Sequence, residues 1–385
     1  MSPKWKFLGI LTFLVPVLIM TYYAVIGGWV TKYAVVYLTG QTAAAAQDNY
    51  FTSFITSPVS PVLFALLFMG VTAFIVYNGV EGGIERVSRC MMPILLVLVV
   101  VIAGYSLTLH HVDESGQMRT GMDGLLYYIT PHFEGLTFSR FLQILLDAMS
   151  QLFFSLSVSM GIMITYGSYV KDDVNLSQAT NQIELFDTGV AFLSGMMIIP
   201  AVFSFSGGNP ETLQAGPSLM FITLPKVFAS MGFGTATGIV FFILVLLAAL
   251  TSAVSLMETS VSTFMDELHW SRKKCCGLMV VIMIVLGTAS SMGYGLLDFI
   301  RIFGMNFLDF FDFMTNSVMM PLAALATCIL ILRVVGIDGM VKEIEQSSPF
   351  RRKKLYRVFI KYFAPICLII ILLSSIANVL GIISM

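Results

Sequence analysis

Apolar runs of about twenty residues recur along the whole chain, and they limit its possible folds more than any other feature. A run of that length is enough for one helix to cross the hydrocarbon core of a bilayer. Of the 385 residues, 57% are hydrophobic and only 11% are charged, whereas soluble globular proteins carry about 25% charged residues. The composition therefore excludes a soluble enzyme, a nucleic-acid-binding protein and a disordered chain. It indicates a polytopic membrane protein.

We expect nine of these apolar segments to cross the membrane. They cover residues 8–38, 59–78, 90–109, 141–169, 184–206, 233–264, 274–296, 302–333 and 357–382. The first is too long for a cleavable signal peptide. The expected fold class is an all-α integral membrane protein, with residues 1–385 in a single transmembrane domain.

Lysine and arginine are distributed unevenly between the connecting loops, and this predicts the orientation. With the N-terminus in the cytoplasm, the inner loops hold 16 of the 21 basic residues and the outer loops hold 5. Cytoplasmic loops are normally the basic ones. We therefore expect a multi-pass protein of the inner (plasma) membrane, with its N-terminus cytoplasmic and its C-terminus outside. The basic cluster 351–354 fits anionic lipid head groups and a plain topology anchor equally well.

The fourth segment, 141–169, is interrupted by residues that form helices poorly. Ser155, Ser157 and Ser159 alternate before Gly161 inside an otherwise apolar run. Unwound backbone at membrane depth is tolerated where it lines a cavity, and transporters place substrates and ions at such breaks. We expect a broken helix here, with a site beside it. A kinked helix whose serines bond back to its own carbonyls is an equally good interpretation of this segment alone.

The sixth segment places small and hydroxyl-bearing residues on one helix face. Ala248, Thr251 and Ser252 follow the i, i+3, i+4 spacing that brings side chains together. Two hydroxyl oxygens and a carbonyl oxygen would suit a hard cation. Helix packing through small residues is the commoner explanation for such a cluster taken alone.

Carboxylates within membrane spans are costly and are therefore candidates for function. Five occur here: Asp147, Asp187, Glu258, Asp309 and Asp312. An interfacial pair is the alternative for the last two, and a helix-end charge is the alternative for Asp187. Asp147 and Glu258 have no evident charged partner in the sequence.

The outer loop 207–232 contains an apolar stretch, Leu219–Pro225, that is too short to span the membrane. We expect it to cap the outer face. HExxH, GxSxG and P-loop motifs are absent from the sequence. We therefore expect no enzyme and no organic cofactor.

These stretches together resemble the neurotransmitter:sodium symporter family, in its bacterial amino acid transporter branch. The matches occur in family order and are Tyr22-Tyr23 with Gly27-Gly28-Trp29, Gln151–Ser157, Ser168-Tyr169, Phe221–Phe228, Leu250–Ser252 with Glu258, and Phe303–Phe307. The resemblance implies a LeuT-type bundle of inverted repeats with sites at the midplane. The chain resembles family helices 3 to 11, so we expect an incomplete bundle that lacks the first two helices.

The resemblance also implies a role for individual residues. The substrate pocket would use Ile19, Tyr23, Phe154, Ser155, Ser157, Met160, Ser252 and Leu256. One sodium ion would bind Ser155 and Asp187, and another would bind Ala248 (carbonyl), Thr251 and Ser252. The extracellular gate would use Tyr23, Phe154 and Asp312.

The implied function is sodium-coupled symport of an amino acid, with an apolar side chain, by alternating access. Asp187 stands where chloride-dependent members lack a carboxylate, so chloride is expected to be unnecessary. One alternative is a fragment or subunit that does not transport unless a partner supplies the missing helices. The other is an intramembrane enzyme that uses Asp147 or Asp187, which no paired aspartate motif supports.

Overall fold

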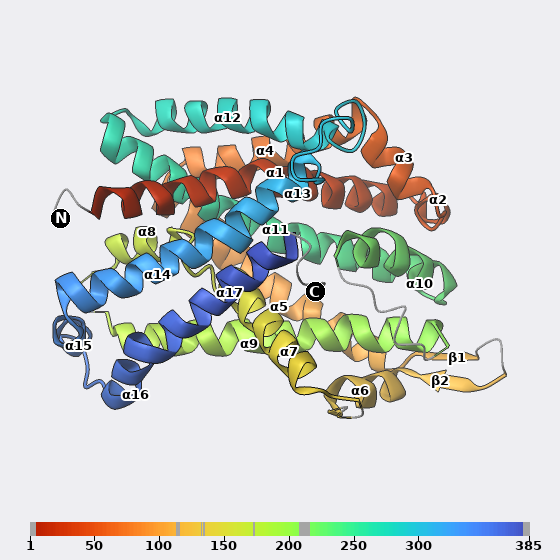
Figure 1. The fold of residues 1–385 in the computed structure, drawn as a ribbon. Coiled ribbons are helices and arrows are strands. Elements are labelled where there is room, and N and C mark those ends of the chain that lie inside the picture. Colours follow the sequence, from red (N-terminus) through yellow and green to blue (C-terminus); the bar gives the residue numbers. More distant parts are fainter. Residues whose placement is uncertain are drawn as a thin grey trace.

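The computed structural model describes residues 5–112, 116–131, 133, 135–171, 174–207 and 216–379, most of them in long helices that run side by side (Figure 1). Eight helical stretches in this described part are long and apolar enough to cross a membrane. They are α1 (Lys6–Leu38), α4 (Ser60–Tyr77), η2 with α5 (Val80–Leu107), α9 (Leu176–Phe205), α11 (Gly234–Leu268), α12 (Arg272–Met292), α13 to η6 (Phe307–Val335) and α16 to α17 (Lys353–Ala377). The predicted all-α membrane fold is confirmed.

The fourth expected segment consists of two shorter helices. α7 covers Phe138–Ser155 and α8 covers Ile162–Tyr169, with no regular helix between them. Neither half counts among the eight long spans. α8 packs on α11, whereas α7 contacts α17 (Ala364–Val379). The break thus separates two helices with different neighbours.

α1 is the central helix of the bundle and packs against α4, α11 and α12. Glycines allow the close approach to α4, because helices in membranes associate through small residues. A Cβ atom at Gly28 would lie 2.5 Å from the backbone nitrogen of Ala65, and one at Gly27 would lie 2.5 Å from the ring of Phe68. Beyond them, Trp29 packs edge-on against Phe51 at 5.3 Å between ring centroids.

Short elements cover one end of the bundle. They are α2 (Thr42–Ala45), α3 (Tyr50–Thr56), the hairpin of β1 (His110–Val112) and β2 (Met118–Thr120), α6 (Gly121–Ile129), η4 (Leu219–Thr223) and α10 (Leu224–Ser230). Residues 208–215 of the expected capping loop lie outside the described residues. The rest of that loop is anchored to α1, since the Tyr33 hydroxyl donates to the Phe221 carbonyl at 2.8 Å. Phe221 also stacks on Phe51 at 5.0 Å.

Two spans begin well before the apolar segments that predicted them. α9 begins at Leu176 rather than near residue 184, because the Asn175 side chain accepts a hydrogen bond from the Gln178 amide and caps the helix. The third span begins at Val80 rather than near residue 90. Its first turns are polar and include an ion pair between Arg89 and Glu85. Hydropathy locates only the part of a helix that lies in lipid.

At the opposite end of the bundle, α15 (Ile337–Glu345) is tied to the start of the last span by two ion pairs. Lys353 contacts Glu345 at 2.6 Å, and Arg357 pairs with Asp338. The hydrogen bond from Lys353 holds the pKa of the Glu345 carboxyl below its usual value. Part of the basic cluster 351–354 therefore has partners within the protein.

The close contact at Gly28 predicts how a single methyl group affects stability. Gly28→Ala should destabilise the protein by about 1–3 kcal/mol, because the new methyl group overlaps the α4 backbone. Gly70→Ala on α4 is the matched control, since a Cβ atom there meets nothing within 4 Å. Thermal unfolding in detergent measures both. Equal melting temperatures for the two variants would contradict the packing described.

Candidate functional site

The backbone between α7 and α8 leaves the helical conformation at three residues. Ser157, Ser159 and Gly161 have φ values of 53°, 64° and 77°. Left-handed backbone costs an L-residue about 1–2 kcal/mol, so the two serines are held there by their surroundings. The chain turns immediately after α7, where the Val158 amide donates to the Phe153 carbonyl at 2.9 Å. The segment is therefore an interruption between two helices rather than a bend within one.

Gly161 lets the interrupted segment lie against two long helices. A Cβ atom there would lie 2.9 Å from the Thr12 carbonyl oxygen of α1 and 3.0 Å from Cγ2 of Thr259 on α11. The C-terminal end of α7 carries partial negative charge, and the N-terminal end of α8 carries partial positive charge. The break thus presents one end suited to a cation and one suited to an anion.

Ser155 and Asp187 meet at the end of α7, as the first expected sodium site requires. The Ser155 hydroxyl donates to Oδ1 of Asp187 on α9 at 2.6 Å. Ser155 is exposed and Asp187 is half-buried. This places a carboxylate and a hydroxyl oxygen beside the negative end of a helix, which is an arrangement that favours a cation.

The residues of the second expected sodium site lie together on α11. The Thr251 hydroxyl donates to the Ala248 carbonyl at 2.9 Å. Ser252 follows on the same helix, and its side chain interacts with the hydroxyl of Tyr23. Tyr23 thereby links the α11 oxygens to α1. No group of three His, Cys, Asp or Glu side chains suited to a metal ion occurs among the described residues.

The apolar residues of the expected substrate pocket belong to one hydrophobic cluster. Ile19, Met160 and Leu256 are buried in it. Tyr23 and Phe154 are half-buried and pack against it. Ser157, in the break, is also half-buried. These side chains come from α1, α11 and the broken helix.

Asp312, the expected acidic residue of the outer gate, belongs to a polar cluster around Tyr22 rather than Tyr23. The Asn316 amide donates to Oδ1 of Asp312 at 2.6 Å and contacts the Tyr22 hydroxyl at 3.4 Å. The Tyr22 hydroxyl also lies 3.3 Å from that of Thr315. Adjacent helical residues point about 100° apart, so Tyr22 and Tyr23 face different clusters. The sequence had not indicated Tyr22, Thr315 or Asn316 as members of this cluster.

Asp309 lies one turn before Asp312 and has partners of its own. The Tyr294 hydroxyl donates to its Oδ1 at 3.4 Å, and the Asn306 amide group donates to its Oδ2 at 2.8 Å. Burial, together with the charge of Asp309, raises the pKa of Tyr294 to about 12. The Tyr294 hydroxyl therefore stays protonated and donates to Asp309 at neutral pH.

The expectation that Glu258 lacks a charged partner is wrong. Glu258 is fully buried on α11 and forms an ion pair with Arg272, the first residue of α12. Tyr169 of α8 donates to its Oε1 at 2.8 Å, and Nε of Arg272 donates to the Val76 carbonyl of α4 at 2.8 Å. This cluster around the buried Glu258 joins four helices. The feature of the sequence that indicates this ion pair is the basic residue Arg272, which follows a short turn after α11.

The second half of the broken helix has another polar contact with α11. The hydroxyl of Tyr166 donates to that of Ser255 at 2.7 Å. By contrast, Asp147 is exposed on α7, and its carboxylate forms no hydrogen bond or ion pair with another described residue. It therefore lies apart from these clusters.

Comparisons with known proteins agree that this chain is similar to sodium-dependent transporters. A family profile described as "Sodium:neurotransmitter symporter family" matches residues 55–382. The uncharacterized sodium-dependent transporter YhdH of Bacillus subtilis (strain 168) is 34% identical over 95% of this chain and 78% of its own length. An uncharacterized sodium-dependent transporter of Haemophilus influenzae is 30% identical over 97% of this chain and 80% of its own length. The crystal structure of MhsT in complex with L-phenylalanine superposes with a TM-score of 0.82, at 36% identity, over 97% of this chain and 82% of that one.

The ion pair between Glu258 and Arg272 predicts that removing one of the two charges destabilises the protein more than removing both. Arg272→Met should destabilise the protein by about 3–5 kcal/mol, because Glu258 then remains buried without a partner. The double variant Glu258→Leu with Arg272→Met should recover much of that loss, since no unpaired charge remains. Thermal unfolding measures both, with the exposed Lys274→Met as the charge-matched control. A double variant less stable than Arg272→Met alone would contradict this account.

Proposed function

The chain belongs to the sodium:neurotransmitter symporter family, and on that premise we propose that it couples sodium entry to uptake of an amino acid with an apolar side chain. It is a multi-pass membrane transport protein and not an enzyme. One observation carries the proposal. Two clusters of oxygen ligands, Ser155 with Asp187 and Ala248 with Thr251, lie on helices that border one apolar cluster.

Sodium is a hard cation and takes oxygen ligands, as other hard cations do. Asp187 supplies a full negative charge at the first site, and the carbonyl end of α7 adds to it. The second site uses the Ala248 carbonyl with the hydroxyls of Thr251 and Ser252. The names of two relatives, both uncharacterized sodium-dependent transporters, support sodium as the coupled ion.

The amino-acid substrate binds between the broken helix, α1 and α11. Its carboxylate interacts with the Tyr23 hydroxyl, which also meets the Ser252 side chain of α11. Ser155 and Ser157 contribute from the break, and Ser252 contributes from α11. The side chain of the substrate packs on Ile19, Met160 and Leu256, which are all buried in one hydrophobic cluster. The structure of MhsT with L-phenylalanine supports a substrate of this kind.

Alternating access requires one barrier on each side of the substrate. Phe154 and Tyr23 close the outer side, with Asp312 above them in the Tyr22 cluster. The inner barrier is the cluster of Glu258, Arg272 and Tyr169, which fastens α8 to α11 and α12. Release of substrate to the inside requires these contacts to separate. The membrane potential contributes about 2.3 kcal/mol per charge per 100 mV to the inward movement of sodium.

A second candidate function is a subunit that transports only with a partner that covers its open face. α7 buries none of its described side chains, and Ser155 and Ser252 are exposed although they belong to the proposed site. Polar groups facing lipid are costly, so a further helix against this face would stabilise it. Uptake by proteoliposomes that contain this chain alone decides against the second candidate.

The distribution of basic residues supports an N-terminus in the cytoplasm, and labelling tests it. Phe233→Cys and Lys354→Cys place single thiols at exposed positions on opposite ends of the bundle, in a background where the exposed Cys90 is serine. A membrane-impermeant maleimide should modify residue 233 in intact cells. It should modify residue 354 only after permeabilisation. The reverse pattern would invert the proposed orientation.

Transport in proteoliposomes tests the function itself. An inward sodium gradient should drive uptake of L-phenylalanine, and Thr251→Val should reduce it about tenfold or more, because one oxygen of the second sodium site is lost. Thr237→Val on the same helix, whose hydroxyl bonds back to Phe233, is the matched control.

The same proteoliposomes test the chloride requirement. Uptake should persist when gluconate replaces chloride, since the Asp187 carboxylate supplies the negative charge. Collapse of uptake in gluconate would remove that role from Asp187. Equal uptake in sodium and in potassium would overturn the proposed coupling.

A further inference from the structure

α6 belongs to none of the expected membrane spans, yet it lies lengthwise against the C-terminal half of one span, α9 (Figure 1). Glycines on both helices allow the contact. A Cβ atom at Gly124 would lie 2.6 Å from Cα of Pro200, and one at Gly195 would overlap the Tyr128 hydroxyl. The Tyr128 ring also stacks on Phe192, at 5.5 Å between ring centroids. Close approach through glycine is typical of helices that pack within membranes.

These contacts fix the depth of α6 relative to the membrane. The two helices run antiparallel, because contacts later in α6 reach residues earlier in α9. Gly195 is the middle residue of the apolar segment 184–206, and it lies about 7 Å from the midpoint of the whole helix at 1.5 Å per residue. Half of the hydrocarbon layer is about 15 Å thick. The C-terminal end of α6, which contacts Gly195 through Tyr128, therefore reaches into this layer.

The polarity of α6 changes along its length in the same direction. Its first turn is polar, because Thr120 and Asp123 form a capping box in which each side chain accepts from the backbone amide of the other. Asp123 is the one charged residue of the helix, and residues 124–129 are glycine, leucine, tyrosine and isoleucine. Tyrosine is enriched where membrane meets water. The charged turn thus lies toward the end of the bundle, and the apolar turns point toward the membrane interior.

The face of α6 turned away from α9 is apolar and exposed. Met122, Leu126 and Ile129 follow the i, i+4, i+7 spacing of one helix face, and their side chains are 50%, 53% and 50% exposed. We call these three residues the α6 stripe. Phe192, which stacks on Tyr128, is itself 45% exposed on a membrane span. The α6 stripe is therefore continuous with the lipid-facing surface of α9.

We propose that α6 is embedded in the leaflet at this end of the bundle, with Met122 at head-group level and Leu126 and Ile129 among the acyl chains. This leaflet is the outer one in the orientation proposed above. Acyl chains remove the stripe from water, which favours this position. α6 leads into α7, so the leaflet would hold the first half of the broken helix at a fixed depth. The inference uses neither sodium nor substrate and is independent of the transport proposal.

Spin labels on single cysteines test this placement in the full chain, in a background where the exposed Cys90 is serine. Met122→Cys, Leu126→Cys and Ile129→Cys place nitroxides along the α6 stripe, in vesicles of phosphatidylcholine and phosphatidylglycerol. Relaxation of the label by oxygen reports contact with acyl chains, and relaxation by a water-soluble nickel chelate reports contact with water. The oxygen-to-nickel ratio should rise steadily from residue 122 to residue 129.

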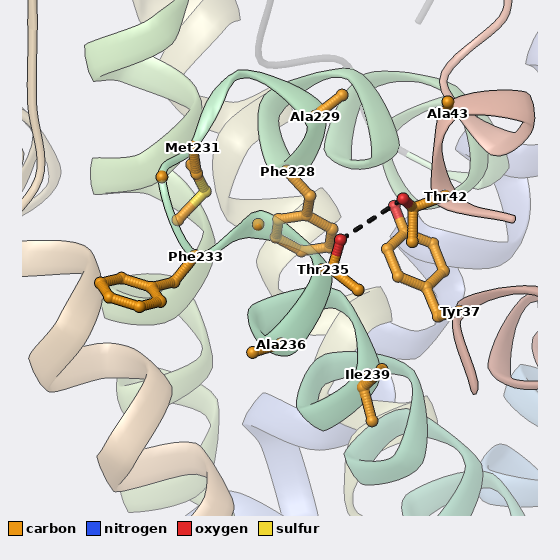
Figure 2. Close-up of a pocket in the computed structure, with 12 residues that line it drawn as sticks. Tyr37, Thr42, Ala43, Phe228, Ala229, Met231, Phe233, Thr235, Ala236 and Ile239 are labelled. Carbon is orange, nitrogen blue, oxygen red and sulfur yellow. Dashed lines mark hydrogen bonds between the residues drawn. The ribbon is translucent and has the colours of Figure 1, made fainter. Parts of the chain in front are cut away.

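Two further positions calibrate this ratio. Val101→Cys places a label on the span α5, where the native side chain is 57% exposed. Ala43→Cys places one at an exposed position on α2, at the edge of the cavity between α2 and α11 (Figure 2). The ratio at residue 129 should match that at residue 101, and the ratio at residue 122 should lie between those at residues 101 and 43.

Two results would overturn the proposal. High nickel and low oxygen accessibility at residues 126 and 129 would show that the α6 stripe faces water. Low accessibility to both reagents would show that protein covers it, either a second copy of this chain or a partner.

Aspartate variants give an independent measurement with the label at residue 129. Leu126→Asp should lower the oxygen-to-nickel ratio there, because a charged side chain is costly at hydrocarbon depth and would draw α6 toward water. Met122→Asp is the matched control, since its charge would lie at head-group level and should leave the ratio unchanged. Equal ratios in the two variants would contradict the proposed depth of α6.

Discussion

Backbone hydrogen bonding in a medium without water is the constraint on which the rest of this structure depends. Polar backbone groups in hydrocarbon must be paired within the protein, so the chain crosses as helices. The one span in which the described backbone loses its helix midway is the segment between Ser155 and Ile162. That segment is sheltered rather than lipid-facing at Gly161, which lies against α1 and α11. In the proposed function, the freed ends of α7 and α8 are the groups that bind the ions and the substrate carboxylate.

The proposed site is connected to the end of the bundle where α11 turns into α12 by partly buried polar contacts. α8 carries Tyr166 and Tyr169, whose hydroxyls bond to Ser255 and Glu258 of α11. Glu258 is held in turn by Arg272. A buried ion pair contributes little net stability but is costly to break on one side. Such a pair therefore suits a contact that must hold in one state and separate as a unit in another, and α8 links it directly to the break beside the proposed substrate site.

Much of the fold and part of the candidate site were predictable from the sequence, for local reasons. Ile19 and Tyr23 are one helical turn apart, so their shared face follows from periodicity alone. Ala248 and Thr251 meet for the same reason, because they are three positions apart on one helix. Periodicity did not reveal that Tyr22 faces Asn316, or that Arg272 returns to Glu258. Those contacts depend on how helices dock and on where short turns reverse the chain, which spacing within one helix does not encode.

The sequence by itself determined that this protein crosses a membrane many times, because apolar length and the scarcity of charge leave no other way to satisfy the backbone. It also placed serine and glycine where the fourth span breaks, but it fitted a kinked helix equally well, and only the structure separated the two. Only the tertiary structure decided that Ser155 meets Asp187 and that the Tyr37 hydroxyl lies buried without a hydrogen-bond partner among the described residues. Both outcomes depend on the packing of helices distant in sequence, where glycines such as Gly238 set how closely the backbones approach.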